Sequence, residues 1–519
     1  MSSDQEKFSS DANSEKMQDF GYFYDVVKMI SGNGISQILR IILSPIISRL
    51  FRPEYFGVMQ NFSSISNILG VLSTMRYDQS IMLPKKREDA ANQFIVSVIF
   101  VLFTMPVFIF LFILFGRLLV NSLNSPELMD LLYFIPVYAA ILGLNAILKQ
   151  WNSRNRKYTQ LSFSLIISEI FSDGGAVGFG LAGLASSVTL TLSRLIGQIA
   201  STFFTAVLIL HQDGKFILQQ FNFKRIIKGI KTYKKFPIFT VWAAFLSMLS
   251  IYLPGMILSG FFTPTIAGYF SFGQSVLRLP ISLIGNSIGD VFFQRASQKA
   301  HQNKLPETVE ETMKQLITIG TFPMLIIMVL GKDLFAIVFG ANWGEAGYYS
   351  QILSMWTLFI FISQPLNRVV SIVGRNEMAL VFGTLKVLVG AISFTVGGLL
   401  GNIYAGLWIF SVAGVLLYSG YFYWIAKITG IRQKLVTFHF ARKISLSIPF
   451  LLILLAVGRY SEFKDIQILD FKIPTANISI LLIAFVEIGF YFLISFLRDP
   501  TLRSVSRDLI RKIGGKHNN

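Results

Sequence analysis

Long apolar runs separated by short polar segments repeat from one end of the 519-residue chain to the other. Most runs hold about 20 residues, enough for a helix to cross a hydrocarbon core of about 30 Å. This pattern predicts an all-α, polytopic membrane protein. The fourteen predicted spans lie near residues 24–50, 57–83, 93–115, 129–148, 158–180, 186–210, 237–260, 266–292, 312–330, 350–367, 377–399, 404–426, 444–458 and 475–497.

Four of these spans carry polar residues at the three- or four-residue spacing that places side chains on one helix face. Such stripes join helices through hydrogen bonds in many membrane proteins. We favour a shared polar cavity, because three of the stripes also contain an arginine. The stripes are Asn33, Gln37, Arg40, Ser44 and Ser48; Gln60, Ser63, Asn67, Gly70, Thr74 and Asp78; Ser187, Thr191, Arg194, Gln198 and Ser201; and Gln274, Arg278, Ser282, Asn286 and Asp290.

Basic residues inside the spans indicate what the cavity binds. A cation at the bilayer centre costs about 2.5–3.5 kcal/mol when it faces lipid, so such residues normally face the bundle interior. Arginine donates paired hydrogen bonds to phosphate and keeps its charge, which favours an anionic head group as ligand. The candidate substrate-binding cations are Arg40, Arg278, Lys386 and Arg194. The candidate cavity-lining polar residues are Asn33, Gln37, Asn67, Gln274 and Asn286.

Acidic residues inside the spans are fewer: Glu169, Asp173 and Asp290. They have two alternative roles, either as ion-pair partners of the arginines or as groups that titrate within the membrane. In the second role they would couple transport to a H⁺ or Na⁺ gradient. No bound cofactor is expected.

The end of the second span contains Arg76 and Asp78 within the segment "MRYDQS". In one interpretation, Arg76 extends its long side chain to the cytoplasmic interface and Asp78 neutralises it. In the other, the two residues form a charged cytoplasmic mouth of the cavity. The sequence leaves both open.

A short internal repeat suggests two lobes. The pattern F-x-P-x-x-x-G occurs at Phe51, Pro53 and Gly57, and again 211 residues later from Phe262. Both copies precede a polar span, which predicts parallel lobes related by an axis along the membrane normal. The predicted organisation is a tail (1–23), an N-lobe (24–210), a basic loop (211–236), a C-lobe (237–426), two C-terminal helices (427–497) and a basic tail (498–519).

The formal net charge of +18 follows the topology. With the N-terminus in the cytoplasm, 33 of the 46 Lys and Arg residues fall in cytoplasmic segments and 7 in external ones. This asymmetry predicts that both termini are cytoplasmic and argues against nucleic-acid binding. For the basic loop 211–236 we favour a contact with anionic membrane lipid over a specific partner site.

The sequence contains no Cys, and its four His residues lie in polar connections or the tail. These facts argue against disulfides and predict no metal site. No external loop is long enough for a soluble domain, which disfavours a membrane polymerase, ligase or glycosyltransferase.

Two blocks carry a family resemblance: "ILSPIISRLFRPEYFGVMQNFSSISNILGVLSTMRYDQSIMLPKKREDAANQF" and "AGYFSFGQSVLRLPISLIGNSIGDVFFQRAS". They resemble Wzx-type polysaccharide flippases of the multidrug/oligosaccharidyl-lipid/polysaccharide exporter superfamily. The resemblance implies two six-helix lobes around a central polar cavity, followed by two further helices. It also implies a transporter rather than an enzyme.

On this resemblance, the substrate is a polyprenyl-diphosphate-linked oligosaccharide. It would move from the inner to the outer leaflet of the bacterial cytoplasmic membrane by alternating access, for surface polysaccharides such as O-antigen, capsule or exopolysaccharide. Membrane lipid and other polysaccharide assembly proteins are the expected partners. The alternatives are a lipid II flippase or an ion-coupled drug exporter of the same superfamily, although a drug exporter for cations should have a more acidic cavity.

Overall fold

The computed structural model describes most of the chain and divides it into two compact units. The boundary falls between Tyr252 and Leu253, inside helix α9 (Val241–Phe261). The described residues are 34–285, 288–289, 292, 296, 305–363, 367, 369–370, 372–373, 375, 377–460, 465–468 and 471–498. The boundaries of the predicted lobes and tails stay predictions.

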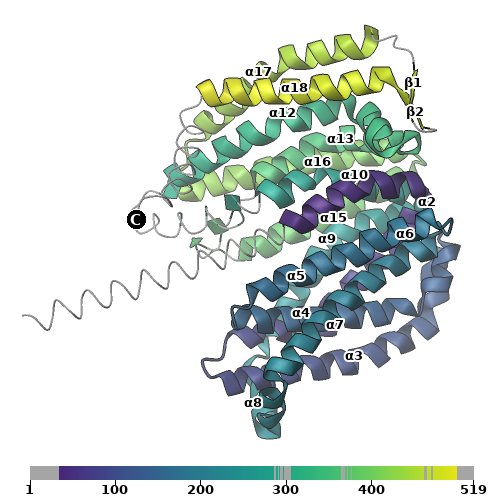
Figure 1. Ribbon diagram of the computed structural model, residues 1–519. Coiled ribbons are helices and arrows are strands. Elements are labelled where there is room, and N and C mark those ends of the chain that lie inside the picture. The colour runs from purple at the N-terminus through teal and green to yellow at the C-terminus, as the bar shows by residue number, and fades with distance from the viewer. Residues whose placement is uncertain are drawn as a thin grey trace, which may run out of the picture. The chain divides into compact units, whose positions relative to one another are not determined.

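The N-terminal unit is a helical bundle (Figure 1). Helix α2 packs against α4 and α7, α3 packs against α4, and α5 packs against α7. The main helices are residues 34–50, α2 (Pro53–Ser73), α3 (Arg87–Ser122), α4 (Phe134–Arg154), α5 (Tyr158–Glu169), α6 (Gly175–Leu181), α7 (Ser187–Gln219) and α8 (Phe223–Thr232). The short elements are the 3₁₀ turns η1 (Tyr77–Met82) and η2 (Pro126–Leu131) and the π turns η3 (Ile170–Gly174) and η4 (Phe236–Thr240).

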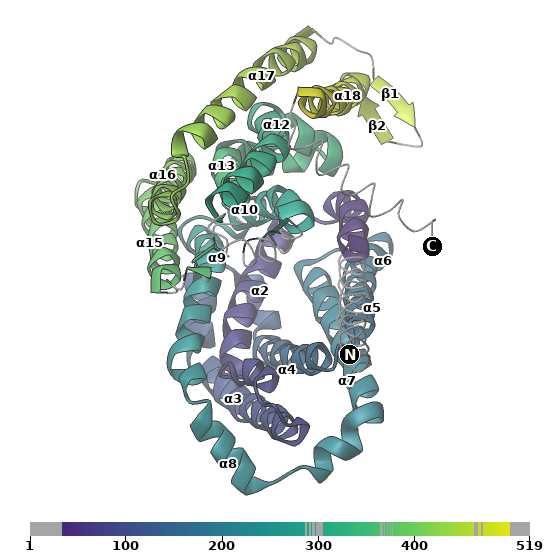
Figure 2. The ribbon, with the colours of Figure 1, turned by 90° about the vertical axis from the view of Figure 1, so that its left-hand side faces the viewer.

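The C-terminal unit is also built mainly from helices. Helix α12 packs on α13, α17 and α18, as Figure 2 shows, while α13 also contacts α10 and α16. The helices are α10 (Pro264–Leu277), α12 (Leu305–Phe339), α13 (Gly344–Ile362), α15 (Glu377–Leu399), α16 (Ile403–Thr429), α17 (Gln433–Tyr460) and α18 (Thr475–Arg498). The π turn η5 (Ile281–Gly285) and the 3₁₀ turn η6 (Ala341–Trp343) complete the helical elements. A short antiparallel hairpin, β1 (Asp465–Ile468) with β2 (Phe471–Pro474), joins α17 to α18.

These observations confirm the all-α membrane class. Within the described residues, nine helices are long and apolar enough to cross a membrane. Helix α3 illustrates the lipid-facing type, because Leu102 and Phe103 are more than 60% exposed although they lie in an apolar helix. Each predicted span that falls in the described part of the chain contains a helix, and the number fourteen stays a prediction.

The repeated motif occupies the same place in each unit. Pro53 is the first residue of α2 and Pro264 is the first residue of α10. Proline suits this position because its missing N–H would have no helical partner there. Gly57 and Gly268 are both buried one turn later.

The second and eighth predicted spans are interrupted by turns, so their helices are shorter than the predicted ranges. Helix α2 ends at Ser73, and Met75 and Arg76 adopt φ values of 48° and 60°. The Thr74 hydroxyl donates a 2.7 Å hydrogen bond to Asp78 and accepts one from the Arg76 N–H, so local polar contacts replace helical ones.

The eighth span is interrupted as well. Helix α10 ends at Leu277, and Arg278 is its C-cap residue rather than a mid-helix residue. Pro280 follows, and a proline cannot donate the N–H that continues a helix. The chain then enters the π turn η5.

Candidate functional site

Four charged side chains of the N-terminal unit form two ion pairs. Arg40, in the helix 34–50, pairs with Glu169 at the end of α5. Arg194 of α7 pairs with Asp173 of η3 at 2.9 Å. We call these four residues the charged cluster. The structure therefore brings together two of the predicted substrate-binding cations and two of the predicted coupling carboxylates.

The π turn η3 creates the geometry of the charged cluster. Helix α5 widens into η3 directly after Glu169, and such turns occur often at functional sites. Ser172 donates a 2.6 Å hydrogen bond to the Ser168 carbonyl inside the turn. A Cβ atom on Gly197 of α7 would lie 2.0 Å from the Ser172 Oγ, so only glycine permits α7 to approach this closely. The close approach places Arg194 beside Asp173.

The charged cluster is electrically balanced, and its two carboxylates are largely removed from solvent. The Asp173 side chain is 2% exposed and that of Glu169 is 13% exposed, whereas Arg40 is 44% exposed. Buried charges are stable only when they are paired, because desolvation of an isolated ion costs several kcal/mol. The pairing therefore explains how two carboxylates remain inside this bundle.

A small cavity of 90 Å³ lies between α4, α5 and α7 and is lined mainly by polar side chains. This volume holds several water molecules. Ser168 and Gln198 each lie close in sequence to a charged residue of the cluster. The lining residues are Asn145, Lys149, Leu161, Ser164, Leu165, Ser168, Gln198, Ser201 and Thr205. The sequence pattern identified Gln198 and Ser201 but missed the α4 and α5 residues, although Ser164 and Ser168 show the four-residue spacing that could have revealed them.

The C-terminal unit holds the other two predicted cations. Arg278 donates a 3.0 Å hydrogen bond from Nη2 to the Gln274 amide oxygen. Lys386 Nζ lies 5.3 Å from the centroid of the Phe382 ring, a distance typical of a cation–π contact. Arg278 is close enough to Lys386 for the two charges to interact.

Other aromatic rings pack against Phe382, the ring that Lys386 contacts. The Phe382 ring stacks on Tyr421 at 4.1 Å and meets Tyr418 edge to face at 5.1 Å. Arg278 also lies close enough to Tyr418 for its charge to interact with the phenol group. We call Arg278, Lys386 and these rings the cation–aromatic group.

Other predicted site residues have local roles. Asn67 donates a 2.7 Å hydrogen bond to the Ser63 carbonyl of its own helix, and Gln37 is half-buried. Asp78 is buried and accepts from Thr74; within the described residues no ion pair joins it to Arg76. The interpretation in which Asp78 neutralises Arg76 is therefore not supported by a direct ion pair among the described residues. Asn33, Asn286 and Asp290 lie outside the described residues.

The apolar helices, long enough to cross a membrane, identify the chain as a multi-pass membrane protein. Residues 46–347 match the family described as "Polysaccharide biosynthesis protein", and the chain belongs to this family. It is 18% identical over 341 residues to the teichuronic acid biosynthesis protein TuaB of Bacillus subtilis (strain 168), which covers 64% of this chain and 68% of that protein. It is 26% identical over 174 residues to the capsular polysaccharide biosynthesis protein CapF of Staphylococcus aureus, covering 32% of this chain and 43% of that protein.

Solved structures share the fold. The lipid II flippase MurJ in an inward closed conformation superposes with a TM-score of 0.67 at 16% identity, covering 93% of this chain and all of that one. An inward-facing multidrug resistance MATE family transporter of the MOP superfamily gives a TM-score of 0.63 at 13% identity, covering 76% and 94%. The resemblance to Wzx-type exporters is therefore confirmed at the level of family and fold.

Proposed function

We propose that this protein is a flippase for a polyprenyl-diphosphate-linked oligosaccharide. It moves this substrate from the inner to the outer leaflet of the bacterial cytoplasmic membrane during the synthesis of a surface polysaccharide. Membership of the polysaccharide biosynthesis family supports the sugar substrate, and the exporter fold supports transport. Both termini lie in the cytoplasm, in accordance with the charge asymmetry.

The observation that carries the proposal is the presence of basic residues within the helical bundles of both units. A diphosphate presents several oxygens that accept paired hydrogen bonds from arginine. Arg40 and Arg194 are held by carboxylates, whereas Arg278 and Lys386 contact an amide and a ring. The rings of the cation–aromatic group are buried in the core of the C-terminal unit. The cations themselves suit a ligand that carries an anionic phosphate.

The charged cluster supplies a means of coupling. When a diphosphate binds Arg40 or Arg194, it replaces Glu169 or Asp173 as the counter-ion. The released carboxylate then takes up a proton. Glu169→Gln should therefore transport without responding to a pH gradient, whereas an unchanged response in both Glu169→Gln and Asp173→Asn would remove these residues from coupling.

A lipid II flippase is the second candidate, because the MurJ fold covers nearly the whole chain. A drug exporter for cations is less well supported, because the charged cluster is balanced rather than acidic. Depletion of the protein followed by analysis of inner-leaflet lipids separates these candidates. Accumulation of a polyprenyl-diphosphate-linked repeat unit supports the proposal, while accumulation of lipid II alone would overturn it in favour of the second candidate.

A further inference from the structure

Helix α8 carries a group of basic residues that does not belong to the charged cluster. It lies at one end of the N-terminal unit's bundle, where α3 begins (Figure 1). Its apolar residue Ile226 is buried with Tyr77 of η1 and Val96 of α3, and Ile230 packs against them. Its basic residues Lys224, Arg225, Lys228 and Lys231 are exposed.

Hydrogen bonds seat α8 firmly on α3 and η1. The buried Asn92 side chain donates to the Gln220 carbonyl at 2.9 Å and accepts from the Asn222 N–H at 3.2 Å. The Tyr77 hydroxyl donates to the Ile230 carbonyl at 3.1 Å. These contacts involve both ends of α8, so the helix is held in place rather than resting loosely on a surface.

The middle of α8 approaches α3 very closely. A Cβ atom on Gly229 would lie 1.9 Å from the Gln93 amide nitrogen. Gln93 is itself buried and accepts a 3.0 Å hydrogen bond from Ser80. The glycine thus allows the two helices to form the wall of a common cavity.

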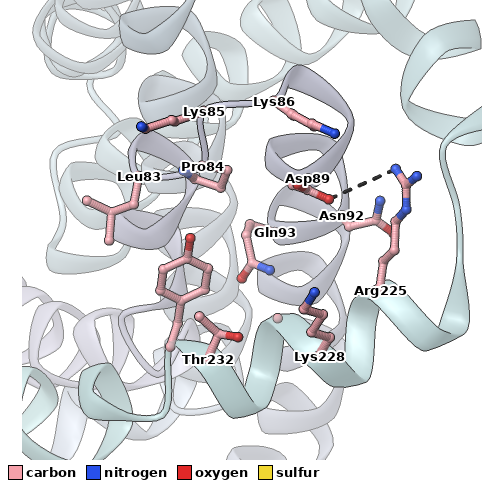
Figure 3. Close-up of a pocket in the computed structure, with 12 residues that line it drawn as sticks. Leu83, Pro84, Lys85, Lys86, Asp89, Asn92, Gln93, Arg225, Lys228 and Thr232 are labelled. Carbon is pink, nitrogen blue, oxygen red and sulfur yellow. Dashed lines mark ion pairs between the residues drawn. The ribbon is translucent and has the colours of Figure 1, made fainter.

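This cavity has a volume of 490 Å³, which lies in the range of small-molecule sites. Basic residues reach it from two separate segments: Lys85 and Lys86 precede α3, while Arg225 and Lys228 come from α8 (Figure 3). Asp89 is the only acidic residue among those that line it. We call it the α3–α8 pocket.

The charges of the α3–α8 pocket are available to a ligand. Arg225 lies 4.0 Å from Asp89, and both side chains are about half exposed, so this ion pair is weak. The first N–H groups of α3 add positive potential near Lys85 and Lys86. A surface that merely attracts a bilayer has no need of a cavity, of buried amides in its wall or of cations contributed by two separate segments.

We propose that the α3–α8 pocket binds a phosphate group. The phosphate belongs either to the head group of an anionic membrane lipid or to a free phosphate compound, and the same chemistry serves both. Because α8 lies in the connection between α7 and α9, an occupant would hold this connection against α3. The proposal does not depend on the transport substrate.

The test uses the purified full-length protein in phosphatidylcholine nanodiscs. One arm adds phosphatidylglycerol to the nanodiscs, and the other adds soluble pyrophosphate. Bound ligand is counted by native mass spectrometry, and the midpoint of thermal unfolding is followed in parallel. Arg225→Gln/Lys228→Gln is compared with Lys224→Gln/Lys231→Gln, which removes the same charge from the same helix without touching the pocket.

We expect at least one probe to bind the wild-type protein and Arg225→Gln/Lys228→Gln to weaken its binding about tenfold or more. The control variant should stay within about twofold of wild type, and Asp89→Asn should tighten binding. Phosphatidylglycerol binding alone identifies a lipid head group, and pyrophosphate binding alone identifies a free compound. Equal losses in both double variants would show diffuse surface attraction and overturn the proposal, as would the absence of binding by either probe.

Discussion

The two units treat membrane-embedded charge differently. In the N-terminal unit each arginine of the charged cluster faces a carboxylate, whereas in the C-terminal unit Lys386 lies over the Phe382 ring. An ion pair cancels a charge, but a ring attracts a cation without cancelling it. We propose that the charged cluster is a structural and switching element, while Arg278 and Lys386 contact the substrate directly.

The largest expected effect comes from a substitution that breaks the charged cluster. Asp173→Asn leaves Arg194 without its carboxylate in a poorly solvated site, so the folded state should lose about 3 kcal/mol of stability. Thermal unfolding of the detergent-solubilised protein measures this loss. In Asp173→Asn/Arg194→Gln part of the stability should return, because no unpaired charge remains; strictly additive losses would show that the two residues do not act as a pair.

The next effect concerns the cation–aromatic group. Arg278→Ala should reduce glycan export about tenfold or more, because a charge-assisted contact worth about 1.5–3 kcal/mol is lost. Arg278→Lys keeps the charge without the planar fork and should reduce export only partially. Export is measured at the cell surface and normalised to the protein in the membrane.

Arg117→Ala is the matched control for Arg278→Ala, because Arg117 is exposed on α3 and lies outside both groups. It should export like wild type. If Arg278→Ala behaves the same way, Arg278 only packs, and the contrast between the two units fails.

A smaller effect concerns the packing that positions the charged cluster. Gly197→Ala places a methyl group against the Ser172 side chain and 2.5 Å from the Ser168 carbonyl oxygen, which is backbone. The cost should be about 1–3 kcal/mol, measured by the unfolding midpoint. Gly178→Ala provides the control, because a Cβ atom there meets nothing within 4 Å. Equal stability of both variants would contradict the close packing of α7 on η3.

The smallest effect lies at the break after α2. Thr74→Val removes the hydroxyl that donates to Asp78 and accepts from the Arg76 N–H, at a cost of about 1 kcal/mol. Thr74→Ser keeps the hydroxyl and should restore most of the stability. A continuous helix through Arg76 would instead tolerate valine, so an unchanged unfolding midpoint in Thr74→Val would contradict the role of this side chain.

The sequence predicted the helices well because long apolar runs mark segments that can cross a membrane as helices, whether their side chains are buried or are exposed as in α3. It also selected all four residues of the charged cluster. It could not pair them, because Arg40 and Glu169 are 129 positions apart and nothing local relates them. The break at Arg76 escaped the pattern because it depends on two side-chain hydrogen bonds and on positive φ at residues other than glycine.

Other features were partly visible in the sequence. Pro280 could have signalled the end of α10 after Arg278, since a proline interrupts helical hydrogen bonding. For the α3–α8 pocket, the sequence predicted only that the basic loop 211–236 contacts anionic lipid, and it did not reveal a cavity. Its shape depends on Gly229, which packs against Gln93, and on Asn92, which donates to the Gln220 carbonyl. Each contact joins residues more than a hundred positions apart and leaves no periodic signal.

The most direct test of the central claim follows the movement of a fluorescent polyprenyl-diphosphate-linked oligosaccharide in vesicles that contain the purified protein. Its accessibility to an external glycosidase reports passage between leaflets. We predict that the wild-type protein moves this lipid and that Arg40→Gln/Arg278→Gln, present in equal amount, moves it at least about tenfold more slowly. Equal rates for the variant and wild type, or a wild-type rate no higher than that of empty vesicles, would contradict the account.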